Sequence, residues 1–237
     1  MWYNLKSEDD EGRYGSMVIC LSTSAPQYRE LYSQARELAS YLLSKMKFST
    51  HTILFSSALG PEVIVEEGVA RLPQCIFHAH KNPDFLLLTG DSSPTDEQFE
   101  FTDLVLSFAS KLGVKEVYSV GARWTEPPVP PEAEPEVKGF STDAEGIEKL
   151  KKHGVKIISN EPAPFFASMV VGLAKDYGMR GYKISVDHGE PRPHTRSVLK
   201  MLNLLSAMIG FEVDATELKD RIREMQERQG RQGTVYS

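Results

Sequence analysis

The sequence predicts an α/β protein in which a mainly parallel sheet is covered by helices on both faces, followed by a charged C-terminal helix and a flexible tail. Short apolar runs alternate with amphipathic segments of roughly 11–20 residues, the pattern of β-α-β crossovers. A chain of 237 residues can form one sizeable core, and its 41% apolar and 25% charged residues are usual for a globular protein. Since no internal repeat is present, we expect a single α/β domain.

In the first half of the chain, strands are predicted where short apolar runs follow polar or glycine breaks. They lie at residues 16–22, 51–57, 75–78 and 85–89, with a shorter pair, a hairpin or side arm, at 62–70. Residues 28–47 have apolar side chains at helical spacing. A second helix is expected to open at Thr95-x-x-Gln98, which has capping-box form, and to run to Leu112 before Gly113.

In the second half, the expected strands lie at residues 116–120, 137–141, 156–159 and 182–186. Five prolines between 127 and 135 predict a stiff loop. Helices are expected from Thr142-x-x-Glu145 to 153, from Pro162 to 177, over the apolar stretch 194–209, and from Asp214-x-x-Glu217 to about 229.

This reading divides the chain into four parts. They are a polar N-terminal extension (1–15), the α/β domain (16–213), a charged helix (214–229) and a flexible tail (230–237). The charged helix has a narrow apolar stripe of Leu218, Ile222 and Met225, which could dock on its own body or on a neighbouring subunit.

Charge and composition exclude several classes of protein. A net charge of −6, with scattered cations, argues against binding nucleic acid. The N-terminus has no signal-peptide core, and the longest apolar run, 165–174, is too short to span a membrane. We therefore expect a cytoplasmic protein without membrane or nucleic-acid partners. Cys20 and Cys75 fall in or beside apolar runs and are expected to be buried free thiols.

The common phosphate-binding and nucleophile motifs are absent. The sequence contains no G-x-G-x-x-G after its first strand, no G-x-x-x-x-G-K-[ST] and no G-x-S-x-G. His78 and His80 would share one face of a strand, as a pair of metal ligands could, but spacing reveals no third ligand. We expect neither a cofactor nor a metal.

Polar residues follow two expected strands at the edge where α/β enzymes place their sites. Gly90 and Asp91 end one strand, and Asp187, His188 and Glu190 follow another. A carboxylate beside a histidine could set the imidazole tautomer for general-base work. Polar residues and glycine also commonly follow strands without any binding role. The five residues are therefore either a candidate ligand rim or ordinary strand ends.

The last three residues, Val235, Tyr236 and Ser237, have the layout of a docking peptide. Val235 would fill a pocket, Tyr236 would provide a rigid amphipathic anchor, and the carboxylate of Ser237 would pair with a cation. The alternative is a frayed terminus, since disorder concentrates at chain ends.

Several segments resemble the archaeal proteasome-assembly-chaperone family, homologues of the eukaryotic assembly chaperone 2. Residues 85–94 (FLLLTGDSSP) are similar to a strand and Gly-Asp-x-x-Pro turn of that family. The resemblance continues through 99–101, 107–114, 117–121, 171–178 and 197–214, and it covers about residues 16–229.

This resemblance implies a three-layer α/β/α sandwich akin to nucleoside phosphorylases, no established catalysis, and assembly into a homo-oligomeric ring, a pentamer or a tetramer. Some members end in a hydrophobic residue, a tyrosine and any residue, the tail that proteasome activators insert between α-ring subunits. Residues 235–237 match that motif position by position.

Three functions follow as expectations. The first is a non-enzymatic proteasome assembly chaperone homologue or adaptor that oligomerises and docks its tails into a proteasome α-ring. The second is an adaptor for a non-proteasomal ring or partner protein. The third is an enzyme, a hydrolase or transferase acting on a nucleoside-like molecule, with Gly90, Asp91, Asp187, His188 and Glu190 converging in one pocket.

Overall fold

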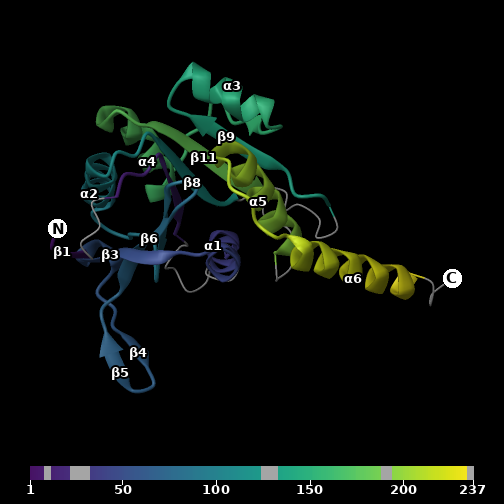
Figure 1. Ribbon diagram of the computed structural model, residues 1–237, viewed down its shortest axis with the longest axis horizontal. Coiled ribbons are helices and arrows are strands. Elements are labelled where there is room, and N and C mark those ends of the chain that lie inside the picture. The colour runs from purple at the N-terminus through teal and green to yellow at the C-terminus, as the bar shows by residue number, and fades with distance from the viewer. Residues whose placement is uncertain (8–11, 22–32, 124–132, 188–193, 234–237) are drawn as a thin grey trace.

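The computed structural model describes residues 1–7, 12–21, 33–123, 133–187 and 194–233. Its main sheet has nine strands in the order β1-β3-β6-β7-β2-β8-β11-β9-β10, and a separate hairpin, β4-β5, projects from the body (Figure 1). The strands are β1 (Tyr3–Ser7), β2 (Ser16–Cys20), β3 (Ser49–Ser56), β4 (Ile64–Glu66), β5 (Val69–Arg71), β6 (Gln74–His80), β7 (Phe85–Gly90), β8 (Glu116–Arg123), β9 (Val137–Ser141), β10 (Lys156–Ile157) and β11 (Arg180–Asp187).

The centre of the sheet is parallel, as the sequence predicts, and its flanks are antiparallel except for the edge pair β9–β10, which is parallel. Strands β7, β2, β8 and β11 run parallel to one another. The flanking pairs β1–β3, β3–β6, β6–β7 and β9–β11 are antiparallel. Where no crossover helix separates consecutive strands, as between β6 and β7, antiparallel pairing needs only a short connection.

The first strand, β1, lies within the stretch expected to be a polar extension. It pairs with β3 at the edge of the main sheet. Its side chains are mostly exposed, so neither a buried face nor an apolar alternation marks it in the sequence. Besides its backbone hydrogen bonds, Leu5 packs against the core and the Ser7 hydroxyl lies 2.9 Å from the Thr52 hydroxyl, so the domain begins before residue 16.

Two helical layers cover the sheet and form two cores. The helices are α1 (Gln34–Lys45), α2 (Gln98–Lys111), α3 (Ala144–Lys152), α4 (Phe166–Ala174), α5 (Thr195–Ile209) and α6 (Thr216–Gly233). Along β2, Val18 faces the core beneath α1 and α5, whereas Met17 and Ile19 face the core beneath α2 and α4. This alternation completes the predicted three-layer α/β/α arrangement.

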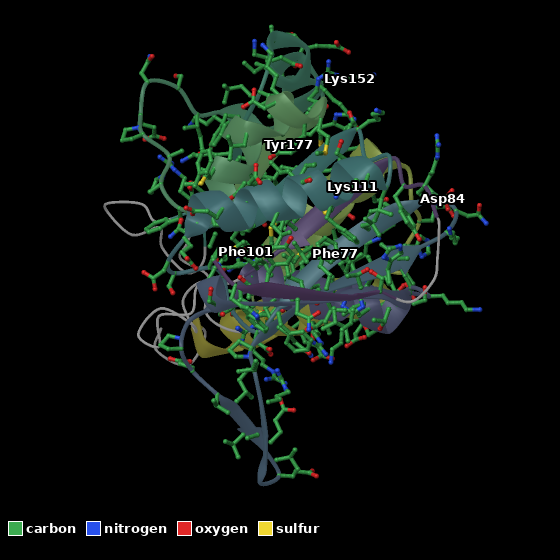
Figure 2. All side chains as sticks on the ribbon, turned by 90° about the vertical axis from the view of Figure 1, so that its left-hand side faces the viewer. Phe77, Asp84, Phe101, Lys111, Lys152 and Tyr177 are labelled. Carbon is green, nitrogen blue, oxygen red and sulfur yellow. The ribbon has the colours of Figure 1, made fainter. Side chains whose placement is uncertain are left out.

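Figure 2 shows α2, with Phe101 and Lys111 labelled, lying across one face of the sheet. On the other side of the molecule α6 extends away from the body (Figure 1). Leu218 of the predicted apolar stripe is buried against the core, while Ile222 and Met225 remain half-exposed. The stripe thus docks on its own domain through its first residue.

Several expected helix starts are wrong by a few residues. In α2, Thr95 does not cap, because Glu97 precedes the helix in a left-handed conformation without a side-chain cap bond. In α3, Asp143 rather than Thr142 is the cap, and its side chain accepts a 2.7 Å hydrogen bond from the Gly146 amide. The helix expected from Pro162 begins at Phe166, since each proline restricts the residue before it to extended conformations.

Both cysteines are buried and free, as predicted. Among the described residues, no helix combines the length and the apolar content that crossing a membrane requires. The proline-rich loop falls largely outside the described part of the chain.

Candidate functional site

Gly90 and Asp91 form the junction between the sheet and the β4-β5 hairpin. A Cβ atom on Gly90 would lie 2.7 Å from the Cys75 sulfur and 2.9 Å from a Leu21 methyl carbon, so only glycine fits. The two carboxylate oxygens of Asp91 accept hydrogen bonds of 2.6 and 3.0 Å from the Arg71 guanidinium. Asp91 also accepts a 2.9 Å bond from the Gln74 amide. These bonds join the base of the hairpin to the sheet, and both carboxylate oxygens of Asp91 take part in them.

Asp187, the last residue of β11, is likewise contacted by cationic side chains. Its side chain is 5% exposed, with one oxygen 2.7 Å from the Lys138 ammonium and the other 3.8 Å from the Arg123 guanidinium. These opposite charges offset the buried negative charge, while Oδ1 has no hydrogen-bond partner among the described residues. Asp187 therefore holds the ends of β8, β9 and β11 together.

The structure does not bring Asp91 and Asp187 into one pocket. The strand order β7-β2-β8-β11 separates them by three strand spacings, which amounts to about 14 Å at about 4.8 Å a strand. His188 and Glu190, the other rim candidates, lie outside the described residues. The same holds for Val235, Tyr236 and Ser237 of the tail.

The β4-β5 hairpin has one apolar face and one charged face. Val65 pairs with Ala70, and strand alternation places Val63 and Leu72 on the same side. These residues are exposed, Val63 by 54%, Val65 by 65% and Leu72 by 49%. On the other face Arg71 binds Glu66 at 2.8 Å. We call residues 63–72 the arm; its apolar face contacts no described part of the body closely enough to be buried.

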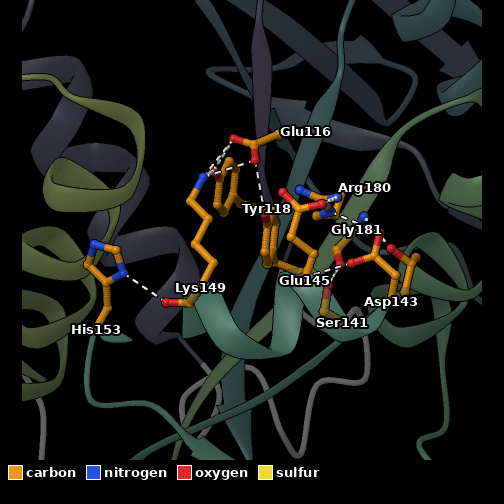
Figure 3. A network of polar contacts seen from close by, with 12 residues as sticks. Glu116, Tyr118, Ser141, Asp143, Glu145, Lys149, His153, Arg180 and Gly181 are labelled. Atoms are coloured by element: carbon orange, nitrogen blue, oxygen red, sulfur yellow. Dashed lines mark hydrogen bonds and ion pairs between the residues drawn. The ribbon is translucent and has the colours of Figure 1, made fainter. Parts of the chain in front are cut away.

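A dense polar network lies at the opposite, amino-terminal edge of the central strands (Figure 3). Glu116 accepts hydrogen bonds from the Tyr118 hydroxyl at 2.6 Å, the Lys149 ammonium at 2.9 Å and the Tyr182 hydroxyl at 2.9 Å. Burial alone would raise the pKa of Glu116, but these bonds outweigh it and lower the pKa. The pKa values of Tyr118 and Tyr182 are raised, mainly by burial and secondly by the hydrogen bond to Glu116.

Beside this cluster, Arg180 binds Asp143 at 2.9 Å and Glu145 at 2.6 Å. The network thus joins α3 to the starts of β8 and β11 (Figure 3). Every charged group in it has a partner of opposite charge, which is the arrangement of a structural clamp.

The two histidines considered as metal ligands have hydrogen-bond partners of their own. The His78 ring lies 2.9 Å from the Thr89 hydroxyl, and burial lowers the pKa of His78. The His80 ring lies 2.9 Å from the Lys47 carbonyl oxygen. Among the described residues no cluster of three metal-binding side chains is present.

Sequence reasoning missed a cluster of Ser33, Glu37 and His194. The His194 ring nitrogen Nδ1 lies 3.0 Å from Glu37 and 3.2 Å from the Ser33 hydroxyl. In a Ser-His-acid relay the serine and the acid contact opposite ring nitrogens. Here both contact Nδ1, so the cluster joins α1 to the start of α5. The 157 residues between Glu37 and His194 leave no spacing signal in the sequence.

The sequence matches a model of a known protein family. A model of the PAC2 family matches residues 13–232, so the chain belongs to the PAC2 family. No curated protein matches the sequence closely enough to count as a relative.

Solved structures agree with this assignment. PbaB of Pyrococcus furiosus, described as an archaeal proteasome activator, is 20% identical with a TM-score of 0.78, over 97% of this chain and 98% of that chain. PbaA of the same organism, described as an archaeal homologue of proteasome-assembly chaperone, is 17% identical with a TM-score of 0.74, over 98% and 92%. A proteasome-assembly chaperone homologue of Mycobacterium tuberculosis is 16% identical with a TM-score of 0.75, over 94% and 96%. At these identities the likeness shows the shared fold.

Proposed function

We propose that this PAC2 protein is a non-enzymatic adaptor that self-associates and docks the tail residues 235–237 into a proteasome α-ring. The observation that carries the proposal is the match of nearly the whole body to a family whose solved relatives include a proteasome activator and an assembly-chaperone homologue. The hydrophobic-Tyr-any sequence of the tail supports it independently of the fold.

The chemistry of the tail suits a pocket between two subunits. Val235 fills an apolar pocket, and Tyr236 supplies a large contact area at a low entropic cost. The carboxylate of Ser237 pairs with a lysine of the partner. One tail buries little area, so its affinity is weak, and several tails on one rigid body bind far more tightly through effective concentration.

The arm supports self-association. A two-stranded hairpin is marginally stable by itself in water, and the arm leaves Val63, Val65 and Leu72 exposed on one uncharged face. A second copy of this chain covers that face in the assembly we propose. Helix α6 extends away from the body (Figure 1), and the tail follows it in the sequence.

Pull-down with purified core proteasome tests the proposal. The full-length chain is compared with a chain lacking residues 235–237, with Tyr236→Ala, and with Gln232→Ala as a control outside the motif. We expect the full-length protein and the control to be retained, and both tail variants to lose at least 90% of the retention, or roughly 1.4 kcal/mol or more of binding free energy.

Equal retention of the full-length and shortened chains would overturn tail docking. Retention of none of the four would remove the proteasome as the partner. Affinity purification from the source cell would then identify the ring or adaptor protein that the tail binds instead.

A further inference from the structure

Lys183 lies in the middle of β11, inside the sheet, and is 8% exposed. Its neighbours Tyr182 and Ile184 face the core beneath α1 and α5, so Lys183 faces the opposite layer. Its ammonium lies 3.5 Å from where a Cβ atom on Gly121 would stand. The ammonium donates to the Ile184 carbonyl oxygen at 3.5 Å, the outer limit of a hydrogen bond.

Within the described part of the chain, no carboxylate lies within ion-pair distance of this ammonium. Asp187 is on the same face of β11, but Lys138 and Arg123 already share its charge. Burial lowers the pKa of Lys183 to about 8, so the side chain is still mostly charged at neutral pH. A buried cation without a counter-charge costs several kcal/mol. Retention of such a costly buried charge indicates that the Lys183 ammonium has a role in the protein.

A second polar group without a partner stands beside the lysine. Ser119 of β8 is paired in register with Lys183, and its side chain lies on the same side of the sheet. The residue is 1% exposed, and its hydroxyl has no hydrogen-bond partner among the described residues. Native proteins rarely leave a buried hydroxyl unpaired.

Gly121 completes the arrangement because it is the next residue of β8 on that side. It carries no side chain and is half-exposed, so the Lys183 ammonium lies over the strand at this point without meeting a side chain of Gly121. Ser119 and Lys183 lie in the middle of their parallel strands, and Gly121 lies nearer the carboxyl end of β8. That end faces the edge where α/β proteins bind ligands.

We propose that Lys183 and Ser119 bind a small oxyanion, a phosphate or carboxylate group, above Gly121. The oxyanion supplies the counter-charge that the ammonium lacks and accepts the hydroxyl hydrogen of Ser119. The low exposure of both side chains limits the bound group to a small one. This site is separate from the tail, so its failure would leave the proposed docking function untouched.

Thermal unfolding of the full-length protein in sodium phosphate, against sodium chloride at matched ionic strength, tests the site. The variants are Lys183→Met and Ser119→Ala, with Lys152→Met as a matched control because Lys152 is exposed on α3. We expect phosphate to raise the Tm of the unmodified and control proteins in a saturable way. Ser119→Ala should weaken the phosphate affinity about tenfold, and Lys183→Met should abolish the response.

Lys183→Met should also unfold at a higher temperature than the unmodified protein in the chloride buffer, because an uncompensated buried charge is gone. An equal phosphate response with and without Lys183 would overturn the site, as would a lower Tm of Lys183→Met in chloride. If that variant does not fold, amine labelling of the unmodified protein read by mass spectrometry decides the question. Phosphate should then slow the labelling of Lys183 and leave that of Lys152 unchanged.

Discussion

At the scale of single residues, Glu37 joins helix α1 to His194, the residue that precedes α5. Its carboxylate accepts hydrogen bonds from the Ser33 hydroxyl at 2.7 Å and the His194 amide at 2.8 Å, and it lies 3.0 Å from the His194 ring. Burial alone would raise the pKa of Glu37, but the bonds from His194 and Ser33 outweigh it and lower the pKa to about 2. The ionised form is therefore strongly preferred in the folded state.

Glu37→Gln tests this contact through its dependence on pH. Because the pKa falls from 4.5 to about 2 on folding, the ionised carboxylate contributes stability above pH 4.5 that is lost as the pH falls toward 2. We expect the substitution to cost about 3 kcal/mol at pH 7 and progressively less below pH 4.5. Urea unfolding at pH 7, 5 and 4 measures this. Glu148→Gln, an exposed ion-pair partner on α3, is the control and should have little effect.

A cost of Glu37→Gln that stays constant across this pH range would contradict the assignment. The loss would then come from packing rather than from charge.

The sequence predicted which residues leave the central strands, but not what they bind. Gly90 and Asp91 end β7 as expected, yet Arg71, the partner of Asp91, lies 20 residues away on the arm. The surroundings of Lys183 were likewise not predictable from the sequence. Its place in an apolar run identifies a strand, while the lack of a counter-charge becomes visible only once the neighbouring strands are placed.

At the scale of elements, the arm projects from the domain with its apolar side chains exposed (Figure 1). The bidentate Arg71–Asp91 contact holds its charged face to the body, and its apolar face remains exposed. Exposed apolar patches mark interaction sites. Self-association through this face would explain why the arm carries apolar side chains that its own domain leaves exposed.

Val65→Asp against Val69→Asp tests the arm with a matched pair. The two valines are 65% and 70% exposed, but Val65 lies on the apolar face and Val69 on the charged face beside Glu66. We expect Val65→Asp to weaken self-association by at least about tenfold, since it buries a charge, and Val69→Asp to leave it nearly unchanged. Light scattering over a concentration series measures both. Equal effects of the two variants would mean that the arm does not pack on a second copy.

The elements themselves show where sequence patterns suffice. Buried parallel strands such as β7 and β8 were predicted within a few residues, because continuous apolar runs bounded by glycine mark them. The edge strand β1 was not, because exposed side chains leave no pattern. Helix starts were shifted because several residues near each start could cap, and tertiary contacts decide which one does.

At the scale of the whole molecule, some contacts stabilise the body of the domain, whereas two elements project from it. The clamp around Glu116 and the contact between Glu37 and His194 join elements within the domain. The arm and α6 project from it (Figure 1). This division is what an adaptor requires, with a rigid body, a surface for its own copies and a separate segment for the partner.

Multivalent docking of weak tails requires more than one copy in each particle, and the mass in solution tests that requirement directly. Sedimentation velocity of the full-length protein at micromolar concentration should give a single species whose mass is two or more times that of the 26.5 kDa chain. A species that remains at 26.5 kDa across the concentration range would contradict the account.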